Sequence, residues 1–128
     1  MEVTMDLEKS ILIVDDFEFA RRICKNALKE IGMTNVTEAS SGIEAMDALS
    51  KQTHDLILTD YNMPSMNGIE MVRKIKANEA IKDIPIIMIT SDCTKSVLLE
   101  ATEAGVQGFL NKPFTKEELS EKIERVLS

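Results

Sequence analysis

Short apolar segments alternate with longer amphipathic segments along the chain. Continuous apolar runs, rich in β-branched residues, occupy 11–14, 56–59 and 86–90. After each run, apolar residues recur every three or four positions, which is the period of one helix face. Strands that are apolar throughout are buried on both faces of a sheet, so these runs predict the central strands of a parallel sheet.

Two further segments predict strands at the edges of the same sheet. Residues 35–39 and 106–110 mix polar and apolar side chains, which is typical of edge strands because they are less buried than central ones. Five strands that alternate with five helices, joined by right-handed crossovers, favour a doubly wound α/β fold. We therefore expect a flavodoxin-like (βα)5 sheet with the strand order 2-1-3-4-5.

Chemical signals mark where several helices begin and end. Ser41 with Glu44, and Thr115 with Glu118, have the spacing of capping boxes. Together with the apolar periodicity, they predict helices over 42–51, 68–77, 94–104 and 115–127. The first helix is predicted to bury one stripe of residues, namely Phe17, Ala20, Ile23, Cys24, Ala27, Leu28 and Ile31.

Length and charge narrow the class of protein. A chain of 128 residues suits about one domain, and we expect a loose tail over 1–9 and the domain over 10–128. The formal net charge of −7 predicts that the protein binds neither nucleic acid nor anionic membrane. No apolar run approaches the roughly 18–20 residues of a membrane span, no export signal is visible, and two cysteines cannot build a disulfide framework. A cytoplasmic protein is expected.

Polar residues follow four of the predicted strands, at the edge where ligands bind in an open parallel sheet. They are Asp15, Asp16, Asp60, Thr90, Ser91 and Lys112. Three carboxylates at one point repel each other unless a cation lies between them, and hard oxygen ligands favour Mg²⁺, Mn²⁺ or Ca²⁺ over Zn²⁺. Mg²⁺ commonly shares its ligands with phosphate, so a metal and phosphoryl site is the prediction; the alternative is that these acids only solvate loop ends.

Four motifs carry a resemblance to a known family. ILIVDD at 11–16, LTDYNMP at 58–64 with Gly68 after it, ITS at 89–91 and FLNKPF at 109–114 resemble the receiver domain of two-component response regulators. The resemblance spans 10–128, and it is greatest to the single-domain chemotaxis regulators of the CheY type.

The resemblance implies a role for individual residues. Asp60 matches the phosphoacceptor, which shares Mg²⁺ with Asp15, Asp16 and the backbone carbonyl of Asn62. The remaining matches are Thr90 and Ser91 as hydrogen-bond donors to the phosphoryl group, Lys112 as its ion-pair partner, and Lys112–Pro113 as a cis peptide.

Four positions bear on switching and dephosphorylation. In the family, phosphorylation draws in the hydroxyl at position 90 and lets the aromatic ring at position 109 change rotamer. Phe109 stands where the CheY type has tyrosine, and Asp92 stands where it has glutamate. Asp92 and Asn62 flank the path of the hydrolytic water, so we expect both to modulate the lifetime of the phosphorylated form.

The resemblance also implies the function and the partners. A histidine kinase phosphorylates Asp60, and the monomeric regulator then binds a target through the fourth helix, fifth strand and fifth helix. The flagellar motor switch or a phosphorelay protein is the expected target, and the only chemistry expected is self-phosphorylation and autodephosphorylation. The alternatives are a receiver excised from a larger regulator or kinase, a phosphorelay intermediate outside chemotaxis, a flavin-binding protein and an aspartyl phosphatase.

Overall fold

The sheet has the predicted order and direction. The computed structural model describes residues 6–128, and its five strands are β1 (Ile11–Val14), β2 (Val36–Ala39), β3 (Leu56–Thr59), β4 (Ile86–Thr90) and β5 (Gly108–Asn111). All neighbouring strands are parallel, in the order β2-β1-β3-β4-β5. The predicted doubly wound fold is therefore confirmed, and the two mixed segments lie at the sheet edges.

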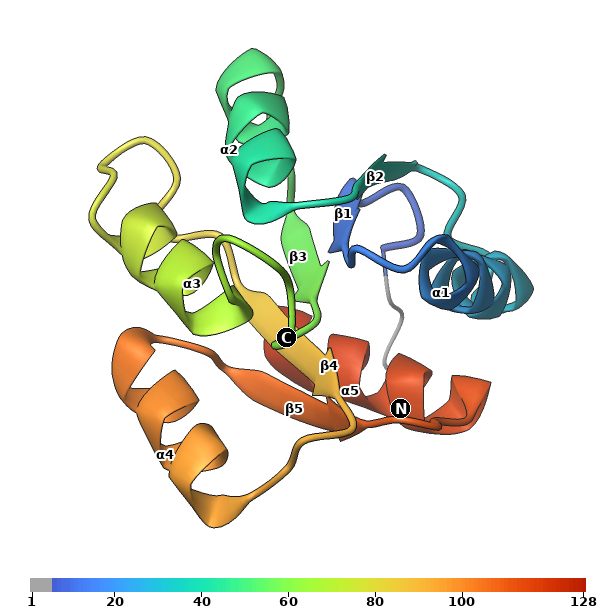
Figure 1. Cartoon of the computed structure of the whole chain (residues 1–128). Helices are drawn as coiled ribbons and strands as arrows, with labels where there is room; N and C mark the ends of the chain where they lie inside the picture. The colour runs from blue at the N-terminus through green and yellow to red at the C-terminus, as the bar shows by residue number, and fades with distance from the viewer. Residues whose placement is uncertain (1–5) are drawn as a thin grey trace.

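Five helices cover the two faces of the sheet. They are α1 (Glu18–Ile31), α2 (Gly42–Lys51), α3 (Gly68–Lys76), α4 (Lys95–Ala104) and α5 (Lys116–Leu127). Helices α1 and α5 lie together on one face, and α2, α3 and α4 lie on the other (Figure 1). The sheet is thus the middle layer of three, which explains why its central strands are apolar throughout.

Alternate residues of the strands supply two separate apolar cores. In β1, Leu12 and Val14 join the core beneath α2, α3 and α4, whereas Ile11 and Ile13 join the core beneath α1 and α5. All four side chains are buried. The strand is therefore apolar on both faces because a helix layer covers each of them.

The helix ends follow local hydrogen bonding. The Thr115 hydroxyl accepts a bond from the Glu118 amide, and the Glu118 carboxylate accepts one from the Thr115 amide, as predicted. At α2 the Ser41 hydroxyl accepts from the Glu44 amide, but the Glu44 carboxylate bonds to Ser40, so this capping box is incomplete.

A second complete capping box, which the sequence analysis did not identify, opens α3. The Asn67 side chain accepts from the Glu70 amide, and the Glu70 carboxylate accepts from the Asn67 amide. Asparagine is a good N-cap, so the Asn67–Glu70 spacing was a signal available in the sequence.

The predicted inward stripe of α1 is wrong at two positions. Phe17 and Ile23 are 62% and 46% exposed, while Cys24 and Leu28 are buried. Phe17 is the N-cap and so precedes the helix, whereas Ile23 lies within the helix but is not among its buried residues. The Phe17 ring meets the ring of Phe19 edge to face, with the ring centroids 6.4 Å apart. The helix face that is apolar in sequence is therefore wider than the face that packs.

The position of His54 just before a strand, at the edge of the sheet where the strands begin, predicts a surface or capping residue rather than a ligand or a catalytic base. His54 is only 5% exposed, and its Nδ1 lies 3.3 Å from the Ser10 hydroxyl. Ser10 precedes β1 and His54 precedes β3, so the parallel pairing of those strands brings the two residues together and covers the ring. The surface interpretation is wrong because this sheet edge is closed by neighbouring segments.

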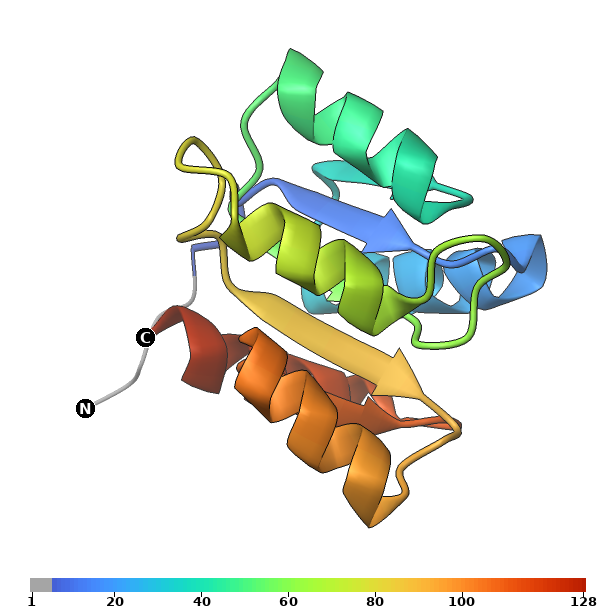
Figure 2. The same cartoon turned by 60° about the vertical axis from the view of Figure 1, so that its left-hand side comes forward.

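The carboxyl ends of the strands lie at one end of the molecule. Figure 2 shows the arrowheads of β1 and β4 pointing the same way, into the loops that carry the predicted site. Within residues 6–128, no helix is both long enough and apolar enough to cross a membrane. Residues 1–5 of the predicted tail lie outside the described residues, and the boundary between tail and domain remains a prediction.

Candidate functional site

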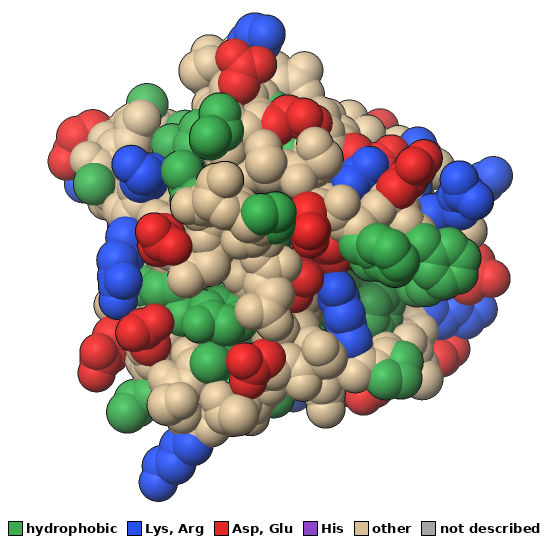
Figure 3. Space-filling view, viewed as in Figure 1, with side chains coloured by type: hydrophobic (Ala, Val, Ile, Leu, Met, Phe, Trp, Pro, Cys, Tyr) green, Lys and Arg blue, Asp and Glu red, His purple; other side chains and the backbone are tan. Residues whose placement is uncertain are grey.

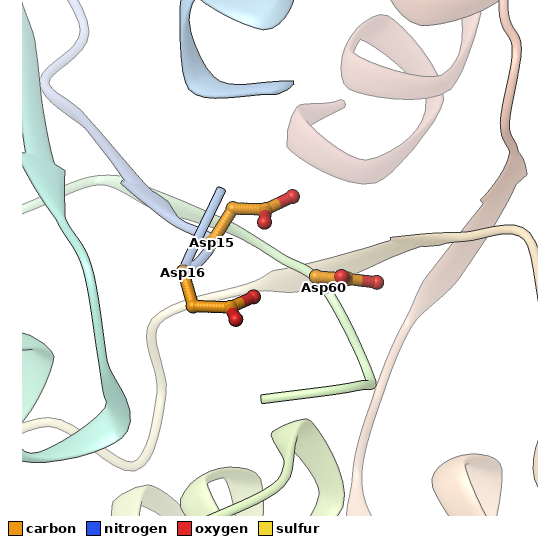
Figure 4. Close-up of side chains that lie close together, drawn as sticks. All are labelled: Asp15, Asp16 and Asp60. Atoms are coloured by element: carbon orange, nitrogen blue, oxygen red, sulfur yellow. The ribbon is translucent and has the colours of Figure 1, made fainter. Parts of the chain in front are cut away.

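Three carboxylates meet where β1 and β3 end. One oxygen from each of Asp15, Asp16 and Asp60 lies within 4.8 Å of the others, and the three side chains extend to the same side (Figure 4). Sheet pairing continues one residue past the strands, because the Asp15 amide donates to Ala39 and the Asp60 amide donates to Val14. Asp15 and Asp60 therefore lie side by side at the ends of two adjacent strands.

Short backbone turns orient two of these acids. The Phe17 amide donates to Asp15 Oδ1 at 3.0 Å, and the Tyr61 amide donates to Asp60 Oδ1 at 2.7 Å. Each bond orients one oxygen of its carboxylate, and Oδ2 of both acids faces the Lys112 ammonium. Asp15 is buried and the Asp60 side chain is only 12% exposed, whereas Asp16 is exposed.

Lys112 supplies a positive charge to the buried pair. Its Nζ lies 2.8 Å from Asp15 Oδ2 and 3.4 Å from Asp60 Oδ2. The residue directly follows β5, its amide donates to the Thr90 carbonyl, and the Lys112–Pro113 peptide bond is cis. In the space-filling view, acidic side chains (red) meet a basic one (blue) near the centre of this end of the molecule (Figure 3).

The environment shifts the pKa of two of these groups. Burial raises the pKa of Asp60, the Lys112 ammonium opposes this, and the Asp15 carboxylate adds to it. Burial alone would lower the pKa of Lys112, but its hydrogen bond to Asp15 and the charge of Asp60 outweigh that effect and raise it. The ammonium is therefore charged at neutral pH and stabilises both carboxylates.

The acids fit a divalent cation. Three carboxylates and one ammonium leave a local formal charge of −2. Among the described residues, no hydrogen bond or ion pair engages the carboxylate of Asp16. Oxygen ligands with excess negative charge suit Mg²⁺, Mn²⁺ or Ca²⁺ and do not suit Zn²⁺.

The other predicted residues lie in β4 and β5 or in the loops after β3 and β4. Thr90 is buried at the end of β4, and its hydroxyl oxygen accepts a bond of 3.1 Å from the Asp92 amide. Ser91 is exposed directly after the strand. Phe109 is half-buried in β5, where it pairs with Met88 of β4. Asn62 is exposed in the loop after β3, and the structure records no contact between it and the carboxylates.

Gly68 closes the loop that carries Asp60. Its amide donates to the Tyr61 carbonyl at 2.8 Å, and a Cβ atom at this position would lie 2.3 Å from the Asp60 carbonyl oxygen. Only glycine allows this approach of α3 to the backbone of the phosphoacceptor candidate, so Gly68 sets the shape of the loop.

Arg21 is a site neighbour that the sequence analysis missed. Its Nη1 donates to the Asp15 carbonyl at 2.7 Å, and its Nε donates to Glu38 of β2 at 3.1 Å. The available signal was a basic residue in the first turn of the helix after the acidic pair, together with an acidic residue on the edge strand. Neither residue is informative without the strand order, which brings β2 beside β1.

The family match and the most similar known sequences agree with each other. The response regulator receiver domain family matches residues 11–124. The chain is 42% identical over 126 residues to the chemotaxis protein CheY-3 of Vibrio cholerae, covering 98% of this chain and 97% of that protein. It is 45% identical over 116 residues to the chemotaxis protein CheY of Pseudomonas aeruginosa, covering 91% and 94%.

Solved structures agree with this family in fold. The chemotaxis protein CheY4 of Vibrio cholerae superimposes with a TM-score of 0.88 at 33% identity, covering 94% of this chain and 99% of that one. The receiver domain of a sensor histidine kinase from Pseudomonas aeruginosa superimposes with a TM-score of 0.85 at 29% identity, covering 94% and 98%. That receiver domain holds a magnesium ion in its active-site cleft.

Proposed function

Because the chain belongs to the response regulator receiver family and is homologous to the CheY chemotaxis regulators, we propose that Asp60 is the residue that accepts the phosphoryl group. The observation that carries this assignment is the position of Asp60 beside two further acids and an ammonium. Flavin binding and aspartyl phosphatase activity find no support in this family.

In the proposed reaction, Asp60 is the nucleophile. A carboxylate oxygen of Asp60 forms a bond to the phosphorus of a phosphohistidine, while the phosphorus–nitrogen bond breaks and its electron pair stays on the imidazole. Phosphoryl transfer depends mostly on positioning and on neutralising charge. The largely buried carboxylate, fixed through its bond to the Tyr61 amide, is placed for that purpose.

Receiver domains bind a divalent metal, and we assign the site in this chain to Asp15, Asp16, Asp60 and the backbone carbonyl of Asn62. We propose Mg²⁺ as the ion, with Mn²⁺ as the alternative. When bound, the ion neutralises negative charge on the oxygens of the phosphoryl group. The magnesium ion in the related receiver domain from Pseudomonas aeruginosa supports this choice.

Protein donors complete the proposed site. The Lys112 ammonium forms an ion pair with the phosphoryl group, and the Thr90 hydroxyl and the Ser91 amide donate hydrogen bonds to its oxygens. Engaging the phosphoryl group draws Thr90 away from its present bond to the Asp92 amide. The loop after β4 then rearranges, and Phe109 on the adjacent strand changes its rotamer.

Receiver domains are not conventional enzymes. The chemistry that we propose is limited to the acyl phosphate that the chain forms on its own aspartate. Self-phosphorylation and autodephosphorylation at Asp60 are the reactions we assign. Water hydrolyses the acyl phosphate, and the side chains of Asn62 and Asp92 modulate that rate by flanking its path.

Receiver domains interact with histidine kinases and with downstream targets. We propose that this chain, as a cytoplasmic monomer, binds its target through the surface of α4, β5 and α5. Leu99 of α4 is exposed there and Phe109 of β5 is half-buried, so a change at Phe109 alters an accessible surface. The flagellar motor switch is the first candidate target because the curated relatives are chemotaxis proteins, and a phosphorelay protein is the second.

Labelling with acetyl phosphate tests the proposed function. Wild-type protein incubated with Mg²⁺ and acetyl phosphate is expected to gain one phosphoryl group, and Asp60→Asn is expected to gain none. Asp47→Asn, which changes an exposed aspartate on α2, is the matched control and should label like wild type. Unchanged labelling of Asp60→Asn would refute the assignment.

A further inference from the structure

Arg21 connects the acidic site to the edge of the sheet. From the first turn of α1, its guanidinium donates one hydrogen bond to the Asp15 carbonyl and another to the carboxylate of Glu38 in β2. The Arg21 side chain is only 15% exposed. Glu38 also accepts a weaker contact from Lys25 at 3.5 Å. A planar guanidinium held at two points is a rigid support for whatever it contacts.

What Arg21 holds is the peptide group that leads into Asp16. The Asp15 carbonyl and the Asp16 amide belong to one planar unit, so fixing the carbonyl fixes the direction in which the chain enters Asp16. The Asp15 amide is held on the other side by the Ala39 carbonyl at 3.1 Å. Asp15 is therefore anchored at its amide, its carbonyl and both of its carboxylate oxygens.

Asp16 has no comparable anchor of its own. Its side chain is exposed, and among residues 6–128 no protein group bonds to its carboxylate. Nevertheless, that carboxylate lies within 4.8 Å of those of Asp15 and Asp60. Its place in the cluster depends on the backbone before it, which Arg21 holds.

We propose that Arg21, braced by Glu38, is a positioning residue for the cation site, acting through the Asp15–Asp16 peptide to keep the Asp16 carboxylate directed at the metal. This inference rests on the proposed function, since it requires that the three acids bind Mg²⁺. Arg21 itself makes no contact with the ion or the phosphoryl group.

The direction in which Mg²⁺ affinity changes distinguishes a positioning role from a purely electrostatic one. A guanidinium next to a cation site repels the cation, so removing its charge should strengthen Mg²⁺ binding by Coulomb's law. Removing a positioning residue should weaken binding. Groups that orient metal ligands typically contribute 10–100-fold in metal affinity, which exceeds the effect of one partly screened charge.

The neighbouring residue offers a matched control. Arg22 carries the same charge on the same helix, but its side chain is 65% exposed and its nearest acid, Glu18, is 3.9 Å away. Methionine in place of either arginine keeps an unbranched stem and a good helix former while removing the guanidinium. Arg21→Met and Arg22→Met therefore remove the same charge, and only Arg21→Met removes the support of the Asp15 carbonyl.

The experiment is a titration with Mg²⁺ alone, followed by tyrosine fluorescence. Tyr61 is the only tyrosine in the chain, there is no tryptophan, and Tyr61 adjoins Asp60, so its emission reports on the site. Isothermal calorimetry provides the same Kd independently. Urea unfolding of each variant shows what fraction is folded, because a purely structural role would change the unfolding midpoint without changing the Kd of the folded protein.

We expect Arg21→Met to raise the Kd for Mg²⁺ about ten-fold and Arg22→Met to leave it within about two-fold of wild type. Phosphorylation of Arg21→Met from acetyl phosphate should recover toward the wild-type rate when Mg²⁺ is raised well above the new Kd. A Kd for Arg21→Met equal to or lower than that of wild type would overturn the proposal.

Two further outcomes are informative. If Arg21→Met does not fold, Arg21→Lys is tested in its place. One ammonium cannot bridge the Asp15 carbonyl and the Glu38 carboxylate as the guanidinium does. A Kd of Arg21→Lys for Mg²⁺ at or below the wild-type value again overturns the proposal. If wild-type protein binds no Mg²⁺, the proposed function fails and this inference fails with it. If wild-type protein binds Mg²⁺ and Arg21→Met has the same Kd, the inference about Arg21 is refuted while the proposed function stands.

Discussion

The Lys112 ammonium lies 2.8 Å from the Asp15 carboxylate, although 97 positions separate the two residues in the chain. Their strands are not neighbours, since β3 and β4 lie between β1 and β5. The Lys112 side chain therefore extends across the carboxyl ends of the central strands and also contacts Asp60, which directly follows β3. In this arrangement the ammonium already neutralises part of the charge that a metal ion would neutralise.

Replacing Lys112 should consequently separate metal binding from phosphorylation. Lys112→Met removes a cation from the site, so the Kd for Mg²⁺ should fall several-fold. The same change removes the proposed partner of the phosphoryl group, so the rate of labelling by acetyl phosphate should fall by at least about ten-fold. Fluorescence titration and labelling at saturating Mg²⁺ measure the two effects; slower labelling caused only by weaker Mg²⁺ binding would contradict this assignment.

Gly68→Ala should destabilise the fold and distort the site together. The added Cβ would meet the backbone carbonyl of Asp60 at 2.3 Å, and backbone cannot move aside as a flexible side chain can. We expect the free energy of unfolding in urea to fall by about 1–3 kcal/mol or more, the usual cost of overpacking.

Gly108→Ala is the matched control for that change. Gly108 is also buried, but a Cβ there would meet only side-chain atoms, the nearest being Val126 Cγ2 at 3.2 Å. Its cost should be clearly smaller than that of Gly68→Ala. Equal costs at both positions would show that the approach to the Asp60 carbonyl is not the cause.

The two cysteines should differ sharply in reactivity. Burial raises the pKa of the Cys24 thiol to about 12, so at pH 8 the thiol stays protonated and lacks the reactive thiolate. Cys93 lies half-buried in the loop after β4. Native protein should react with one equivalent of a thiol reagent, native Cys93→Ser with none, and unfolded wild type with two. Rapid loss of both thiols in the native protein would count against this description of the core.

Stability should fall as the pH is lowered past neutrality. Burial lowers the pKa of His54 below its ordinary value of 6.5, so the unfolded chain binds a proton more readily than the folded one. The contribution of neutral His54 is complete above pH 6.5 and is lost as the pH falls toward the lower folded pKa. His54 is the only histidine, so His54→Gln should show a smaller difference in unfolding free energy between pH 7.5 and 5.5. An unchanged difference would exclude this origin.

The architecture was predictable because its signals are local. The three apolar runs and the capping residues each describe a short segment, and the handedness of crossovers then limits the order of the strands. The strand ends likewise indicated that Asp15, Asp16 and Asp60 would meet, since sheet pairing places them at one edge.

What sequence reasoning missed depends on packing between distant segments. The exposure of Phe17 and Ile23 is set by how much of α1 the sheet and α5 cover, and periodicity does not report that width. The burial of His54, which precedes β3, depends on Ser10, which precedes β1. The bridge from Arg21 to Glu38 requires β2 to lie beside β1, and so becomes visible only once the strands are ordered.

Locating the phosphoryl group within the phosphorylated protein tests the central claim most directly. Borohydride reduces an acyl phosphate at its own residue, and tandem mass spectrometry of the resulting peptides identifies that residue. After incubation with Mg²⁺ and acetyl phosphate, the reduced position should be Asp60 alone, and omission of the metal should abolish the product. Reduction at Asp15, Asp16 or any residue other than Asp60 would contradict the account.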